Sequence, residues 1–190
     1  MQTSIQEIVA EVTVYYLEMT DYRQLRPKRN IPEGFMLQQA EIPLPELNRF
    51  FYASVGVDWY WTVRLSWTYQ QWQDWVERTE VSTWIGYLSG TPAGYFELAK
   101  QAGDDSVELA YFGVLPHFTG QGLGGHLLTC ALEQAWRLNP KRVWLHTCSL
   151  DHPNALANYQ ARGFRLFREE DLMDDVPAEP IQPWGGANRD

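Results

Sequence analysis

The segment from Val107 to Gly125 constrains the fold more than any other part of the chain. Its apolar first part, VELAYFGVL, predicts a strand, and the glycine-rich loop TGQGLGG then opens an apolar helix. Such a loop leaves backbone N–H groups unpaired at the start of the helix, where the helix dipole adds about half a positive charge. The segment therefore predicts a site for an anion such as phosphate or pyrophosphate.

A second informative segment, DHPNALANYQARGF, follows the next predicted strand. It predicts a short helix over 153–162, because proline favours a first helical turn and Gly163 favours the end of a helix. Asn154 and Tyr159 both lie on this helix.

The rest of the chain alternates between strand-like and helix-like patterns. Strands are expected over 12–19, 37–42, 82–88, 93–99, 107–115, 143–148 and 164–168, and helices over 46–54, 67–80, 123–138 and 153–162. This order predicts one α/β domain over 1–170, with a mixed sheet and helices on both faces. An acidic, proline-containing tail is expected over 171–190.

Charge and hydropathy exclude several classes of protein. The chain has a net charge of −9 and no basic stripe, which argues against a nucleic-acid partner. No apolar run reaches the eighteen or so residues of a membrane span, and the N-terminus lacks the pattern of a signal peptide. We therefore expect a cytoplasmic protein without a membrane partner, in which Cys130 and Cys148 are reduced thiols.

The glycine loop admits two interpretations besides a site for phosphate or pyrophosphate. Residues 120–125 contain G-x-G-x-x-G, the fingerprint of dinucleotide-binding folds. That fingerprint also needs an acidic residue at the end of the next strand, whereas this strand ends at Ser149 and Asp151 comes late. Alternatively, the glycines serve only to let the helix pack closely on the sheet.

Two motifs point to one family. Residues 117–122, HFTGQG, match both glycines of R/Q-x-x-G-x-G/A, with His at the first position. The later NALANYQARGF matches N-x-x-A-x-x-x-Y-x-x-x-G-F with two residues fewer between Asn154 and Tyr159. In this order, the motifs resemble those of the GNAT superfamily of acyl-CoA N-acyltransferases over residues 82–168. The resemblance implies a GNAT-like α+β fold, with a mixed, mostly antiparallel sheet whose central strands splay apart.

The resemblance also implies a reaction, in which an acyl group, most simply acetyl, passes from acetyl-CoA or another acyl-CoA to an amine. Tyr159 takes the place of the general acid that protonates the leaving thiolate. Asn154 and the backbone near Val114 would contact CoA. The N–H groups that would hold its pyrophosphate belong to Gly120, Gln121, Gly122, Leu123, Gly124 and Gly125.

An alkylamine is mostly protonated at neutral pH, so a group must accept its proton. Glu108, a solitary acid in an apolar strand, is the first candidate, and Glu97, His146 or a water chain are alternatives. The aromatic cluster Asp58-Trp59-Tyr60-Trp61 with Trp67 suits either a pocket for a cationic acceptor or a tryptophan-rich core. The histidines and cysteines show no metal-ligand spacing, so no metal is expected.

The sequence thus favours an N-acetyltransferase that acts on a primary amine of a small molecule or peptide. A non-catalytic, regulatory CoA-binding module is the main alternative. A nucleotide-dependent oxidoreductase and a protein-interaction domain are further ones. The identity of the acceptor, the length of the acyl chain and the formation of a homodimer stay open at this point.

Overall fold

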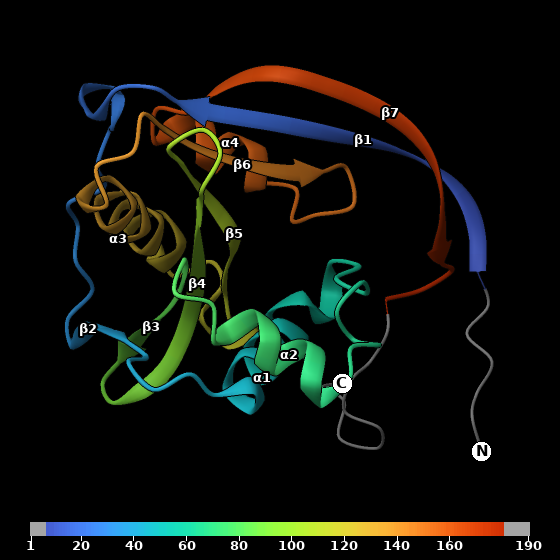
Figure 1. The fold of residues 1–190 in the computed structure, drawn as a ribbon, viewed down its shortest axis with the longest axis horizontal. Helices are drawn as coiled ribbons and strands as arrows, with labels where there is room; N and C mark the ends of the chain where they lie inside the picture. The colour runs from blue at the N-terminus through green and yellow to red at the C-terminus, as the bar shows by residue number, and fades with distance from the viewer. Residues whose placement is uncertain (1–6, 181–190) are drawn as a thin grey trace.

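The structure, a computed structural model, describes residues 7–180 of the chain. Seven strands form one sheet in the order β2-β3-β4-β5-β6-β1-β7, and only β5 and β6 pair in parallel (Figure 1). The strands are β1 Glu7–Met19, β2 Phe35–Gln39, β3 Val81–Leu88, β4 Thr91–Gln101, β5 Ser106–Val114, β6 Arg142–Cys148 and β7 Arg165–Pro177. The predicted mixed, mostly antiparallel sheet is therefore confirmed.

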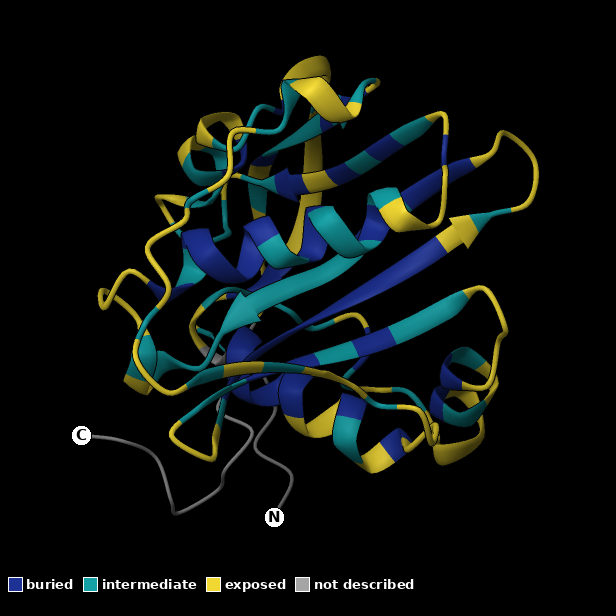
Figure 2. Ribbon diagram, turned by 90° about the vertical axis from the view of Figure 1, so that its left-hand side faces the viewer, coloured by how far each residue is buried: buried dark blue, intermediate teal, exposed yellow. Residues whose placement is uncertain are grey.

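Helices cover both faces of the sheet, as expected. They are α1 Pro45–Val55, α2 Tyr69–Val76, α3 Leu123–Arg137 and α4 Ala155–Ala161, with short 3-10 turns η1 Tyr22–Gln24, η2 Gly56–Asp58 and η3 Pro116–Phe118. One core cluster joins α3 and α4 to the sheet, and a second joins α1 to β3 and β4. Figure 2 shows burial concentrated in the central strands and on the inner face of the long helix.

Both ends of the described chain are more regular than the sequence indicated. Residues 7–11 belong to β1, and residues 171–177, expected as the start of the acidic tail, belong to β7. The expectation was wrong because the acid-rich stretch EEDLMDD has no strong strand propensity of its own. It is held as a strand by antiparallel pairing along nearly the whole of β1. The rest of the expected tail, 181–190, lies outside the described residues.

The strands β1 and β7 continue beyond the body of the sheet. Residues 14–19 of β1 pair with β6, whereas residues 7–13 pair with β7 alone. We call this two-stranded extension, made of residues 7–13 and 171–177, the arm. It curves past the end of β6 toward the side that carries α1 and α2 (Figure 1).

The centre of the sheet forks. The parallel pairing of β5 with β6 covers only their first residues and ends at the pair Glu108–Trp144. Beyond this pair β5 remains bonded to β4, and β6 remains bonded to β1. The edge of β5 from Leu109 to Val114 thus faces β6 without strand pairing, and its backbone groups are available to a ligand.

Candidate active site

The glycine loop has the backbone shape that its sequence predicts. Gly120 and Gly122 adopt φ of +78° and +80°, in the left-handed region that favours glycine. The helix α3 begins directly after them, at Leu123, so the N–H groups of its first turn lack partners within the helix. This arrangement has the backbone geometry that an anion site requires, and the binding of an anion here stays a prediction.

Two basic side chains that sequence reasoning missed lie beside the loop. The Lys28 Nζ donates a hydrogen bond of 2.9 Å to the Gly122 carbonyl. A methyl group added at Gly125 would stand 2.6 Å from Arg162 Nη1 and 2.8 Å from Lys28 Cδ. These two cations can supply positive charge to a bound phosphate. His117, at the first position of the motif, is not always charged and cannot be relied on for this.

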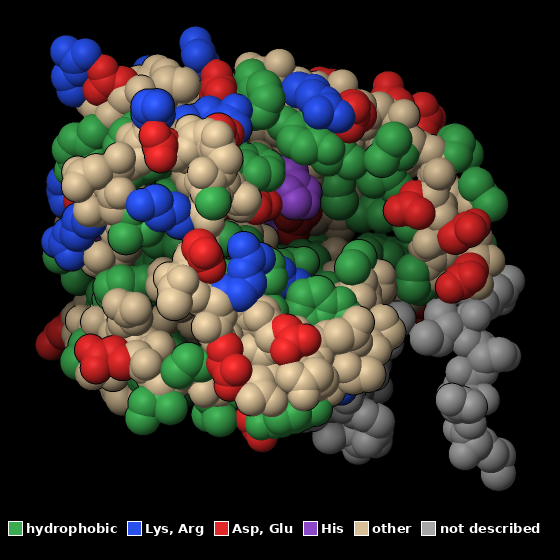
Figure 3. Space-filling view, in the orientation of Figure 1, with side chains coloured by type: hydrophobic (Ala, Val, Ile, Leu, Met, Phe, Trp, Pro, Cys, Tyr) green, Lys and Arg blue, Asp and Glu red, His purple; other side chains and the backbone are tan. Residues whose placement is uncertain are grey.

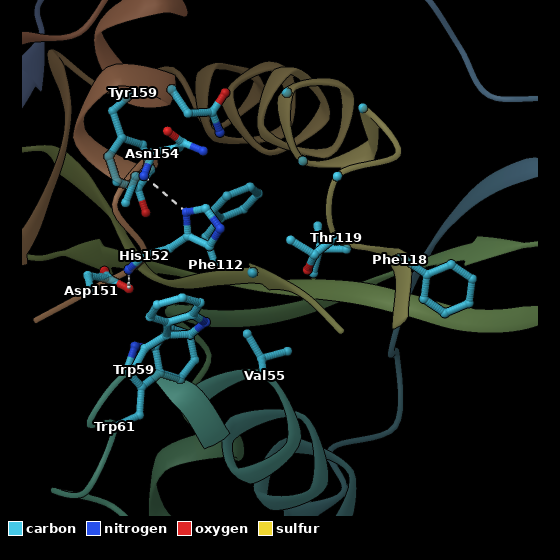
Figure 4. A pocket seen from close by; sticks show the side chains of 18 residues that line it. Val55, Trp59, Trp61, Phe112, Phe118, Thr119, Asp151, His152, Asn154 and Tyr159 are labelled. Carbon is cyan, nitrogen blue, oxygen red and sulfur yellow. Dashed lines mark hydrogen bonds between the residues drawn. The ribbon is translucent and has the colours of Figure 1, made fainter. Parts of the chain in front are cut away.

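A cavity of about 360 Å³ lies between the glycine loop and α4 (Figure 4). We call it the glycine-loop cavity. Of the residues predicted to bind a cofactor, Gln121 and Leu123 do not line it, since the Gln121 side chain donates to the His117 carbonyl and Leu123 is buried in the core. The contribution predicted for Gln121 and Leu123 comes from their backbone N–H groups and not from their side chains. The predicted residues that do line it are Val114, Gly120, Gly122, Gly124, Gly125, Asn154 and Tyr159.

Tyr159, the predicted general acid, lies on the walls of two adjoining cavities. Its ring is 6% exposed and packs edge-on against Phe112 and Phe164. Burial, with a smaller contribution from the Asp151 carboxylate, raises the pKa of Tyr159 well above its usual value. The phenol therefore keeps its proton at neutral and moderately alkaline pH and is available as a proton donor.

A second cavity of about 300 Å³ adjoins the first, and we call it the aromatic cavity. Its walls come from the loop after η2, from β5 and β6, and from the arm, whose acidic residues include Asp174. Figure 3 shows a hollow on this face, with acidic side chains along its β7 side. None of the described residues that line it is Lys or Arg. The residues that line both cavities are Trp59, Trp61, Phe112, Asp151 and Tyr159.

The predicted aromatic cluster divides between a pocket and the core. Trp59, Tyr60 and Trp61 line the aromatic cavity, and Figure 4 shows both tryptophans facing the Asp151 loop. Trp67 instead packs against Trp72, at a ring separation of 5.1 Å. The interpretation as a tryptophan-rich core therefore holds for Trp67, whereas an acceptor pocket at Trp59 and Trp61 stays a prediction.

Glu108, the first candidate base, lies at the fork of β5 and β6. It accepts a hydrogen bond of 3.1 Å from Gln101 Nε2, and its Oε1 is 3.6 Å from His146 Nδ1. Burial raises the pKa of Glu108 and lowers that of His146. Glu108 lines neither cavity, whereas His146 lines the aromatic cavity. A catalytic role of Glu108 stays a prediction.

Glu97, the second candidate base, is wholly buried and has polar partners on both carboxylate oxygens. Arg64 Nη1 lies 3.0 Å from Oε2, Trp75 Nε1 donates to Oε2 at 2.7 Å, and Asn48 Nδ2 donates to Oε1 at 2.9 Å. The guanidinium is stacked 4.2 Å from the ring centroid of Tyr111. This network anchors the loop that carries Trp59 and Trp61, and Glu97 faces neither cavity.

Two further observations concern the described part of the chain. Within residues 7–180, no three His, Cys, Asp or Glu side chains are grouped so that they could hold a metal ion. No helix in the same range is long and apolar enough to cross a membrane.

The forked sheet and the glycine loop at the start of α3 agree with the fold that the resemblance to acyl-CoA N-acyltransferases implied. The family can be named from the sequence match. A model of the acetyltransferase (GNAT) family matches residues 44–164, and the chain belongs to this family.

Solved structures share the fold at low sequence identity. A GCN5-related N-acetyltransferase from Kribbella flavida is 16% identical with a TM-score of 0.62, over 90% of this chain and 60% of that one. The corresponding protein from Sphaerobacter thermophilus is 16% identical with a TM-score of 0.64, over 92% and 54%. A spermidine N-acetyltransferase from Vibrio cholerae, in complex with CoA and spermine, is 16% identical with a TM-score of 0.57, over 75% and 92%. This chain thus spans less than two thirds of the length of the first two.

Proposed function

We propose that this protein transfers an acyl group, acetyl in the simplest case, from acyl-CoA to a primary amine of a small molecule or peptide. The observation that carries the proposal is the junction of two cavities at Tyr159. One cavity contains an anion site, and the other has aromatic and acidic walls without basic residues. The junction between them is the place where a thioester and an amine can meet.

The residues of the glycine-loop cavity fit CoA. The N–H groups of residues 120–125 suit its pyrophosphate, and Lys28 and Arg162 lie beside them. The free edge of β5 near Val114 suits the amide groups of the pantetheine arm, because its backbone lacks a partner on the β6 side. Asn154 precedes α4 at the wall of the same cavity. Acyl-CoA supplies the activated acyl group as a thioester.

The residues around the junction would manage the protons. Tyr159 holds a proton on its phenol and can donate it to a thiolate, since burial keeps it protonated. The pair Glu108–His146 offers one route for the proton of the ammonium, since His146 faces the aromatic cavity. Such proton transfers typically contribute about 10²–10⁴-fold to the rate.

Release of free thiol tests the proposal. Acetyl-, propionyl- and longer acyl-CoAs are combined with alkylamines, arylalkylamines, amino acids, aminoglycosides and short peptides. Polyamines are included because one structural neighbour was solved with spermine. We expect amine-dependent thiol release, with mass spectrometry showing one acyl group added to the amine.

The alternative of a regulatory CoA-binding module gives a different result. Such a module would bind CoA, with a higher melting temperature and slower hydrogen exchange over residues 120–125, but would release no thiol with any amine. A protein that shows neither binding nor thiol release would contradict both functions.

A further inference from the structure

Asp151 is a carboxylate that the sequence did not single out for this chemistry. It follows β6, in the loop that leads to α4, and it lines both cavities beside Tyr159 (Figure 4). The Thr147 hydroxyl donates to its Oδ2 at 2.7 Å, and the His152 N–H donates to its Oδ1 at 3.0 Å. These neutral donors fix the carboxylate in place without neutralising it.

Asp151 differs from Glu97 and Glu18 because no short ion pair holds its carboxylate, and only the more distant His152 and His146 interact with it electrostatically. Glu97 is paired with Arg64, and Glu18, whose side chain is 12% exposed, is paired with Arg142 and Arg165. Within the described chain, no Lys, Arg or His side chain forms an ion pair with Asp151. A partly buried carboxylate without a counter-ion is unfavourable unless a ligand supplies the charge.

We propose that Asp151 is a catalytic residue that binds the ammonium group of the acceptor at the junction of the two cavities and accepts its proton. This inference rests on the proposed acyl transfer and names the residue that starts it. Trp59 and Trp61 form the adjacent aromatic wall, which suits a cation held close to a carboxylate. Glu108, which lines neither cavity, is then displaced from this role.

The proton balance of the step is complete without a further reactant. The nitrogen of the ammonium loses two protons while the C–N amide bond forms and the C–S thioester bond breaks. The first proton goes to the Asp151 carboxylate and from there to water. The second replaces the proton that Tyr159 donates to the leaving thiolate. The products are the amide, free CoA thiol and one released proton.

Binding of matched amines and alcohols tests the ammonium site without turnover. The probes are hexylamine with hexanol, 2-phenylethylamine with 2-phenylethanol, and tryptamine with tryptophol, titrated calorimetrically. We expect the wild type to prefer the amine in at least one pair by about 30-fold or more, and Asp151→Asn to lose that preference. A wild type without any amine preference, or a variant that keeps it, would overturn the proposal.

Asp171→Asn is the matched control for this experiment. Asp171 lies on β7 and accepts a hydrogen bond from Thr13 Oγ1, which asparagine can still accept. It lines neither cavity, so we expect unchanged binding and turnover. A loss in this variant equal to that of Asp151→Asn would show a general effect of negative charge and would also overturn the proposal.

Turnover measurements distinguish Asp151 from Glu108 as the group that accepts the proton of the ammonium. We expect Asp151→Asn to lower kcat at least about 100-fold, and by a larger factor than Glu108→Gln does. The opposite ranking would assign the proton to Glu108 and refute the inference. A wild type that releases no thiol with any amine would instead refute the proposed function, so the two failures are distinguishable.

The pH dependence gives a third readout. Burial raises the pKa of Asp151 above its usual value, and the Thr147 hydroxyl, the backbone and side-chain charge of His152, and the Trp61 side chain oppose this rise. Since the ionised carboxylate is required, kcat/KM should fall as the pH drops through this raised pKa, and Asp151→Asn should lack this limb. Other titratable groups around the carboxylate are His146, Cys148, His152, Tyr159 and, on the cavity wall, Tyr60, Tyr111, Asp174 and Asp175. If Asp151→Asn kept the same fall of kcat/KM at acidic pH as the wild type, the fall would belong to a histidine, and this result would count against Asp151.

Discussion

The buried pair of Arg64 and Glu97 allows a sharp test of the interior electrostatics. Glu97→Gln keeps the size and shape of the side chain but removes its charge. The Arg64 guanidinium, 6% exposed, would then remain in the interior without a counter-ion. The amide nitrogen of glutamine would also face either Arg64 and Trp75 or Asn48, all of which donate hydrogen bonds to this carboxylate.

The expected loss is large. Removing one partner of a buried ion pair costs about 3–5 kcal/mol, because the remaining charge has no compensation. For a chain of this size, each kcal/mol lowers the melting temperature by about 2–4 °C, which gives a fall of roughly 6–20 °C. The loop that carries Trp59 and Trp61 should loosen as well, so binding of amines should weaken together with stability.

Urea unfolding at neutral pH measures the free energy of unfolding for Glu97→Gln and for a control. The control is Glu80→Gln, whose partner Arg78 is 3.9 Å away with both side chains about 40% exposed, so its loss should stay below about 1 kcal/mol. The double variant Arg64→Met/Glu97→Gln should cost less than the sum of the single changes. A loss below about 1 kcal/mol for Glu97→Gln, with a large fall in kcat, would refute the structural role and restore Glu97 as a base.

Three more changes have definite expected outcomes. Tyr159→Phe should lower kcat at least about 100-fold while the Kd for acetyl-CoA, measured by calorimetry, stays within about twofold. Lys28→Met should raise the KM for acetyl-CoA about tenfold but leave S-acetylpantetheine, which has no pyrophosphate, unaffected; equal losses for both would exclude a phosphate contact. Gly163→Ala should destabilise the fold by at least about 2 kcal/mol in urea unfolding, because φ is +106° and the new methyl would stand 1.9 Å from the Gln24 carbonyl oxygen. Gly103→Ala, which meets no atom within 4 Å, is its control and should change little.

Local patterns were sufficient for the parts of the site that are local in sequence. The left-handed Gly120 and Gly122, the start of α3 and the position of Tyr159 before Gly163 all follow from short motifs. The fold class followed from the order of elements and from the family resemblance. These features depend on neighbours within a few residues or on a recurring arrangement, so a single sequence carries them.

The remainder depends on contacts between distant residues. Lys28 reaches Gly122 across 94 positions, and no pattern near Lys28 indicates that contact. From the sequence, Asp151 entered only as an acid that comes too late for the dinucleotide-binding fingerprint. Its position in a cavity depends on where Trp61 packs, which the sequence does not show. Glu97 looked like a free acid in a strand because its partner Arg64 lies in an irregular loop. Burial and pairing of a charge are decided by tertiary packing.

The position of β1 between β6 and β7 has a consequence for the order in which the molecule assembles. Contacts such as Thr13 with Asp171 join residues 158 positions apart, whereas β3, β4 and β5 follow one another as neighbouring antiparallel strands. Closing so long a loop is entropically unfavourable until the intervening chain is ordered. During synthesis, we therefore expect the half of the molecule that would hold CoA to acquire its shape early. The half that would receive the amine is completed only when β7 has left the ribosome.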